Sequence, residues 1–355
     1  MSGPLPELRA AELDLLAAVD RSRRRDESIA AWRRWAASID IDRVDAGTFE
    51  LLPRLHRRLE ELGATAAAGS RIPGVYRFAW SRNQLLLAAA ADAGRELDAA
   101  GIRTAAIAGT WIGFDRAGDA GIRPLREATL AIDPATAREA IATLLGRGWT
   151  TPSPGAERRL CRGDSIAMRS PAEAASEVRL CYRLPVQILG IRRLLARSRP
   201  AAADDERGVA VPAPDDLLAE LCIEGIVGRP HRRLGWIADA GELLAGGRID
   251  WAQLLCTARD RCIAGHLSVA LDQLERLGAG RVPAVTVGAL EATESPRFER
   301  AALWGRARRA RAPRALAFGY DQHRRHQALG SEDPIARPGP FDSLRQRHGA
   351  ADPPR

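Results

Sequence analysis

The 355-residue sequence contains no lysine, so arginine supplies all 53 of its Lys and Arg side chains. No run of about eighteen uncharged apolar residues occurs, which excludes a membrane-spanning helix on sequence grounds. The five cysteines include no Cys-x-x-Cys pair, which argues against a disulfide framework and a zinc finger. The N-terminus lacks the basic and then apolar layout of a signal peptide. We therefore expect a cytoplasmic protein.

The net charge of +8 is concentrated near the C-terminus. Residues 306–355 hold eleven arginines and five acidic residues, a net charge of +6, which leaves about +2 for the rest of the chain. So small a charge is not typical of a broadly basic nucleic-acid-binding body. The Arg- and Pro-rich tail is either a solvated, flexible extension or a docking strip for an acidic peptide or a partner protein. Nucleic acid is the least favoured partner, because the tail has too few aromatic residues to stack bases.

Hydrophobic periodicity changes along the chain. Apolar residues first recur at three- and four-residue spacing, as in amphipathic helices, and then form short runs bounded by glycine or proline, as in buried strands. In chain order the sequence predicts an N-terminal helical segment (1–100), an α/β core (101–195), a linker or surface loop (196–214), a C-terminal helical domain (215–305) and a flexible tail (306–355). Thr48 is the expected N-cap of a helix that ends at Gly63, and periodicity is lost from Val282 onward.

Five pieces of sequence, in order, carry a family resemblance. They are RNQLLL (82–87), LDAAGIRTAAIAG (97–109), GIRPLREATLAID (121–133), EVRLCYRL (177–184) and LCIEGIVGRPHRRLGWIADAGELL (221–244). Together they resemble the uncharacterised bacterial nucleotidyltransferase-like family, whose members are often found beside peptide or polysaccharide biosynthesis genes. The resemblance implies an α+β fold, in which a nucleotidyltransferase-like mixed sheet is flanked by N-terminal and C-terminal helical segments.

The resemblance also implies positions for a metal site. Nucleotidyl transfer needs divalent metal, and two carboxylates at i and i+2 on a strand, with a third on the neighbouring strand, form a cage for hard cations. In this sequence the three positions fall on Glu127, Thr129 and Arg179. One acid, one neutral hydroxyl and one cation therefore stand where three acids are expected. If the chain is active, we expect Glu127 to bind Mg²⁺, with ATP or another NTP as substrate.

Other residues suggest alternatives for this site. Glu177 lies two residues before Arg179, and Glu224 stands where the family has a histidine, so Glu127, Glu177 and Glu224 are candidates for a rebuilt catalytic set. The alternative is that Glu127 is a solvated acid and that Glu177 pairs with a nearby arginine. Arg179 either holds a phosphate or carboxylate directly, or forms an ion pair with Glu127 that seals the site.

Besides Arg179, five residues are candidates for substrate or phosphate binding. Gly109 and Thr110 form the turn after the first predicted strand, where backbone N–H groups can approach phosphate. Arg123 either anchors a phosphate or braces its turn. Asp239 either contacts the cleft or makes a helix-capping or interhelical hydrogen bond. Thr129 offers only a weak oxygen ligand.

Two functions remain open at this point. The chain either transfers NMP from an NTP to a small molecule or peptide, or is a catalytically inactive protein that binds a peptide, a nucleotide or a partner protein in the inherited cleft. Fold alone does not decide between them.

Overall fold

The structure is a computed structural model that describes residues 8–300, with gaps, and Leu303. The gaps are 66–68, 70, 116–118, 153–164, 173–175, 184–189, 201–207, 228–233 and 298. The predicted basic tail at 306–355 lies outside the described residues.

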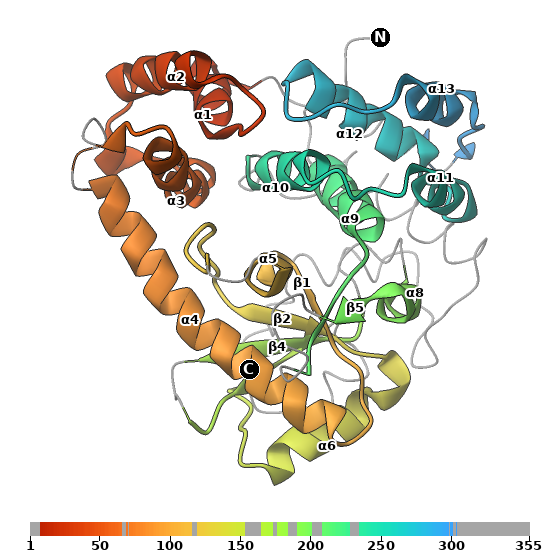
Figure 1. The fold of residues 1–355 in the computed structure, drawn as a ribbon. Helices are drawn as coiled ribbons and strands as arrows, with labels where there is room; N and C mark the ends of the chain where they lie inside the picture. The colour runs from red at the N-terminus through yellow and green to blue at the C-terminus, as the bar shows by residue number, and fades with distance from the viewer. Residues whose placement is uncertain are drawn as a thin grey trace, which may run out of the picture.

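Helices stand on both sides of a central sheet in the sequence and in space (Figure 1). They are α1 (Ala10–Val19), α2 (Arg25–Ser38), η1 (Ile41–Arg43), α3 (Ala46–Glu61), α4 (Arg71–Asp98), α5 (Thr110–Asp115), η3 (Pro134–Thr136), α6 (Ala137–Gly146), α8 (Ile191–Arg197), α9 (Pro214–Val227), α10 (Gly235–Ala245), α11 (Trp251–Asp260), α12 (Ala264–Arg276) and α13 (Ala284–Ala292).

The described sheet has six strands in the order β3-β4-β2-β1-β6-β5. The strands are β1 (Ala105–Ile107), β2 (Ala128–Ala131), β3 (Ser165–Arg169), β4 (Glu177–Cys181), β5 (Arg199–Pro200) and β6 (Ala210–Val211). Two neighbouring pairs, β2 with β4 and β1 with β6, are parallel, and the other pairs are antiparallel. This mixed sheet between two helical segments confirms the predicted α+β fold.

Two helices of different length pack against the central strands. Helix α4 packs against β2, β4 and α6, the short α5 packs against β1, β2 and β6, and α4 and α5 also contact each other. Figure 1 shows α9 and α10 beyond α5, and the N-terminal helices α1 to α3 at the far end of α4. Along β3 and β4, buried residues such as Met168 and Val178 alternate with half-buried ones such as Arg169 and Glu177. The face that carries Glu177 is therefore accessible to solvent at this edge.

Two local predictions need correction. The N-cap of α3 is Asp45, whose side chain accepts a hydrogen bond from the backbone N–H of Thr48. Thr48 has a favourable residue type for a cap, but Asp45 also places a negative charge at the positive end of the helix. Helix α13 lies within the predicted C-terminal helical domain, although the sequence loses periodicity from Val282 onward; it buries Thr286 and Leu290 and packs against α11 and α12.

Two short pieces of segment 196–214 join the sheet, although we expected the segment to form a linker or surface loop; residues 201–207 lie outside the described residues. Its two strands, β5 and β6, have two residues each, which is too short for an alternating pattern. Tertiary contacts hold β6 in place. The backbone N–H of Ala210 donates to the backbone carbonyl oxygen of Thr104 at 3.0 Å, and Ala210 pairs with Ala105 of β1.

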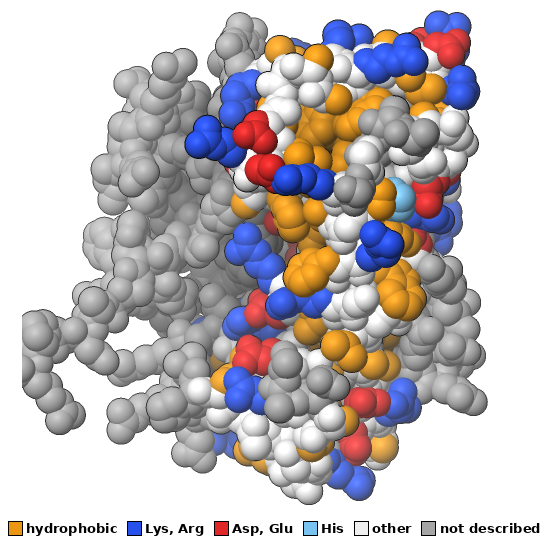
Figure 2. All heavy atoms as spheres, turned by 90° about the vertical axis from the view of Figure 1, so that its left-hand side faces the viewer, with side chains coloured by type: hydrophobic (Ala, Val, Ile, Leu, Met, Phe, Trp, Pro, Cys, Tyr) orange, Lys and Arg blue, Asp and Glu red, His pale blue; other side chains and the backbone are white. Residues whose placement is uncertain are grey.

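The molecular face along α4 mixes charge and apolar surface. Figure 2 shows arginines interspersed with acidic side chains on this face, and hydrophobic side chains among them. Helix α4 contributes the exposed side chains of Phe78, Trp80 and Leu85. Within the described part of the chain, no helix combines the length and hydrophobicity that a membrane span requires.

Candidate functional site

The turn between β1 and α5 has an unusual backbone conformation. Ala108 has a φ of 52° and Gly109 a φ of 90°. A Cβ atom on Gly109 would lie 3.0 Å from the guanidinium carbon of Arg123. Glycine is therefore favoured at position 109 both by its backbone conformation and by the close approach of Arg123.

Thr110, the first residue of α5, uses its side chain to hold the next strand. Its buried hydroxyl oxygen accepts a hydrogen bond from the backbone N–H of Thr129 at 2.9 Å. This contact fixes the N-terminus of α5 against the start of β2. Gly109, Thr110 and Thr129 thus lie together, although the Thr110 hydroxyl already serves a structural contact.

Strand register brings the predicted metal-site positions onto one face. Strands β2 and β4 are parallel neighbours, and Thr129 pairs with Arg179 across them. Glu127 directly precedes β2 and, being two residues from Thr129, points to the same face, as Glu177 does relative to Arg179. The arrangement expected of the family positions is therefore present, with different side chains.

Arg179 holds both carboxylate oxygens of Glu127. Its Nε donates to Oε1 at 2.6 Å and its Nη2 donates to Oε2 at 2.5 Å, while Nη1 donates to the Ser165 hydroxyl at 3.3 Å. The hydrogen bonds to Glu127 raise the pKa of Arg179, and partial burial opposes this shift. Of the two alternatives for Arg179, the structure contains the ion pair with Glu127.

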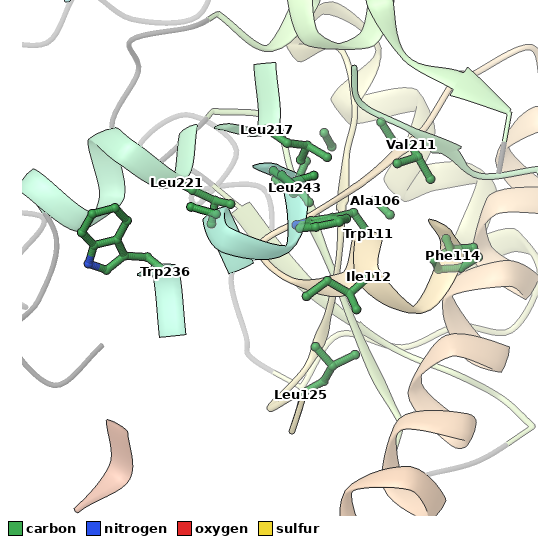
Figure 3. Packing of buried hydrophobic residues seen from close by; sticks show 14 of the residues in the cluster. Ala106, Trp111, Ile112, Phe114, Leu125, Val211, Leu217, Leu221, Trp236 and Leu243 are labelled. Atoms are coloured by element: carbon green, nitrogen blue, oxygen red, sulfur yellow. The ribbon is translucent and has the colours of Figure 1, made fainter. Parts of the chain in front are cut away.

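The other two candidate carboxylates occupy different surroundings. Glu177 forms an ion pair with Arg169, its neighbour on β3, at 3.0 Å. Glu224 lies on α9, seven residues after Leu217, and so shares a helix face with it. Figure 3 shows Leu217 beside Trp111 of α5, so this face of α9 is turned toward α5.

These residues do not fit a magnesium ion. Both oxygens of Glu127 face a guanidinium group, and the position opposite Thr129 on β4 carries a cation, Arg179. Mg²⁺ favours carboxylate and water oxygens in octahedral geometry. Among the described residues, no group of three or more His, Cys, Asp and Glu side chains is placed to hold a metal ion.

A buried charge cluster joins the turn to the helical segments. Asp239 of α10 forms ion pairs with Arg54 of α3 and with Arg123, which precedes β2. The side chain of Asp239 is 1% exposed and those of Arg54 and Arg123 are 6% and 13% exposed. Arg123 therefore braces its turn, and Asp239 makes interhelical contacts.

Two residues of this region were not predicted from the sequence. Arg54 is the one charged residue in the apolar stretch LLPRL (51–55), a signal for a buried cation. Asn83, in the RNQLLL piece, is also buried, and its amide donates to the carbonyl oxygens of Ala120 and Arg123 at 2.5 and 2.6 Å and accepts from the N–H of Leu125 at 3.0 Å. Asn83 thereby fixes the loop that positions Arg123.

Two family-matched residues have a packing role. Gly225 of α9 lies against the indole of Trp236 in α10, where a Cβ atom would collide with the ring. Leu217, Leu221 and Leu243 extend this contact toward Trp111 (Figure 3). Glycine at 225 therefore allows α9 and α10 to approach closely above α5.

Comparisons with known proteins support the resemblance to the nucleotidyltransferase-like family. A family model described as an uncharacterised nucleotidyltransferase matches residues 46–277, which include α3 to α6, the sheet and α8 to α12 up to Leu277. Neither the curated proteins nor the solved structures include a match to the chain. The matched segment is well over half of the 355 residues, and the chain therefore belongs to this uncharacterised nucleotidyltransferase family.

Proposed function

We propose that this chain is a catalytically inactive member of the nucleotidyltransferase family that acts as a peptide-, nucleotide- or partner-binding protein in a biosynthetic pathway. The observation that carries this proposal is the pairing of both Glu127 oxygens with Arg179. Metal-dependent NMP transfer requires a carboxylate that is open to a divalent ion. Here the carboxylate retained from the family pattern already has a cationic partner.

Electrostatics supports an inactive metal site. To admit Mg²⁺ beside Glu127, the protein would have to open the ion pair and leave the Arg179 guanidinium next to a divalent cation. Like charges at short range repel each other, most strongly where solvent is partly excluded. Arg179 is about one-third exposed, so nearby water only partly screens this repulsion.

Ligand-dependent thermal unfolding tests the proposal. We expect ATP and GTP to give no rise in melting temperature that depends on Mg²⁺, because stabilisation requires binding to the folded state. Pyrophosphate release from either nucleotide should stay at the level of a protein-free control. Stabilisation by a nucleotide in EDTA would support binding through guanidinium groups without metal.

A matched pair of variants sharpens this test. Mg²⁺-dependent stabilisation that disappears in Glu127→Gln but persists in Glu139→Gln would overturn the proposal, since Glu139 is an exposed acid on α6. Such a result would instead support NMP transfer from an NTP, with Glu127 as metal ligand.

A further inference from the structure

A second candidate site lies outside the face that carries Glu127. It is a cavity of about 300 Å³ between α1, α3, α10 and the loop before β2. This volume is at the lower end of the range for small-molecule pockets. Four arginines contribute to its lining: Arg21, Arg54, Arg57 and Arg58. We call it the arginine cavity.

Three of the four arginines lie on one face of α3. Positions 57 and 58 follow position 54 by three and four residues, so both side chains are neighbours of Arg54 on the helix surface. Like charges at this spacing destabilise a helix, and anionic groups must offset them. Asp239 pairs with Arg54, and Asp119 accepts from Nε of Arg57 at 2.9 Å.

The remaining two arginines have weaker compensation. Arg58 Nη2 donates to the carbonyl oxygen of Arg23 at 2.9 Å, but its buried Nε has no acceptor among the described residues, and its ion pair with Glu61 is long, at 3.4 Å. Glu61 also pairs with Arg21 at 2.7 Å, so one carboxylate serves two guanidinium groups. Arg21 contacts a second acid, Glu242, only at 3.6 Å.

We propose that the arginine cavity binds a small molecule through an oxyanion group, a phosphate or a carboxylate, with Arg21 and Arg58 as its principal contacts. Guanidinium groups present planar forks of N–H donors that match such oxygens, and a buried donor without an acceptor costs free energy. An oxyanion here would also stabilise Arg54, because burial lowers the pKa of that side chain.

This inference goes beyond the proposed function, because it needs neither Glu127 nor Arg179. Different experimental results would overturn the cavity proposal and the proposed function. Mg²⁺-dependent transfer would overturn the inactive assignment and leave the cavity untouched, whereas absence of oxyanion binding would leave the argument from the Glu127–Arg179 ion pair unchanged.

Isothermal titration calorimetry of the full chain tests the proposal, with inorganic phosphate and acetate as separate ligands. We expect binding of at least one of them, and binding of only one identifies the favoured oxyanion. Arg58→Gln and Arg21→Gln should each weaken it by about tenfold or more, the size expected when a charged hydrogen-bonding group is lost. Glu61→Gln should tighten it, because removing this carboxylate releases Arg21 and Arg58 and lowers repulsion.

Arg24→Gln provides the matched control. Arg24 is 84% exposed and pairs only with Glu27 among the described residues. Its substitution by Gln removes the same charge as Arg58→Gln. Equal weakening in Arg24→Gln and Arg58→Gln, or no binding of either anion to the unmodified chain, would overturn the proposal. If Arg58→Gln does not fold, the Arg21→Gln variant decides the question, since Arg21 is 42% exposed and its substitution should leave the core intact.

Discussion

The guanidinium group of Arg123 lies close to Gly109, so that a Cβ atom on the glycine would be 3.0 Å from the guanidinium carbon, tighter than an ordinary contact. Arg123 also pairs with Asp239, so the β1–α5 turn is linked to α10 through one side chain. The backbone of the turn, with Ala108 and Gly109 both at positive φ, is therefore held by contacts with a helix far away in the sequence.

Substitution of Gly109 by alanine should destabilise the protein. A Cβ atom would be strained at a φ of 90° and would press on Arg123, and the expected loss is about 1–3 kcal/mol. Urea unfolding monitored by circular dichroism measures it. The control is Gly146→Ala at the end of α6, where no atom lies near the added Cβ; equal losses in both variants would contradict the role assigned to Gly109.

Removal of the Asp239 charge should lower the free energy of unfolding more than Gly109→Ala does. Asp239→Asn leaves Arg54 and Arg123 without their shared carboxylate in a buried position. Breaking one side of a buried ion pair costs about 3–5 kcal/mol, which the same unfolding measurement can detect. Asp272→Asn is the comparison, because Asp272 forms an exposed pair with Arg276 on α12 and exposed pairs contribute about 0–1 kcal/mol. A loss for Asp239→Asn no larger than that of Asp272→Asn would show that the cluster does not stabilise the fold.

The outcome for Glu127 and Arg179 shows what sequence patterns could predict. Resemblance to the family placed both residues on neighbouring strands, and the register confirms that they are neighbours. The type of each side chain then favoured an ion pair as one of two alternatives. Local sequence and family pattern together therefore predicted the central strands of the sheet and reduced the role of Arg179 to two alternatives.

Other features depend on contacts that no local pattern records. Arg54 joins Asp239 across 185 positions of sequence, and nothing near Arg54 identifies its partner. Strands β5 and β6 have two residues each and exist because β1 offers an edge for pairing. Helix α13 is stabilised by packing on α11 and α12 rather than by an amphipathic repeat.

Restoring the family acids should restore cation binding. The double variant Thr129→Asp/Arg179→Asp removes the guanidinium from Glu127 and places three carboxylates on one face of β2 and β4. We expect it to bind Mn²⁺, which prefers oxygen ligands, whereas the unmodified chain should not. Electron paramagnetic resonance of free Mn²⁺ reports the binding.

The control for this variant carries the same changes elsewhere. Thr143→Asp/Arg138→Asp lies on α6 and adds as much negative charge. Mn²⁺ binding by the control as strong as that by the double variant would indicate non-specific attraction. A folded double variant that does not bind Mn²⁺ would refute the assignment of positions 127, 129 and 179 to one metal site.

Stability should fall with rising pH because of a carboxyl group on α9. Burial, together with the charges of Glu224 and Asp216, raises the pKa of Glu220 from 4.5 to about 8. An acid whose pKa is higher in the folded state is protonated more readily there, so its contribution to stability is complete below about pH 4.5 and is lost as the pH approaches 8. We expect the isosteric Glu220→Gln, which cannot ionise, to be more stable than the unmodified chain at pH 8.

Comparison of Glu220→Gln with the unmodified chain over a range of pH isolates the contribution of the Glu220 carboxyl group to stability. The difference in unfolding free energy between Glu220→Gln and the unmodified chain should be small near pH 4.5 and grow up to about pH 8. Glu220 is only half-buried, and screening by water should keep the difference smaller than the full shift implies. Glu139→Gln, at an exposed position on α6, should show no such growth. A difference that is constant with pH would mean that Glu220 ionises as freely in the folded chain as in the unfolded one.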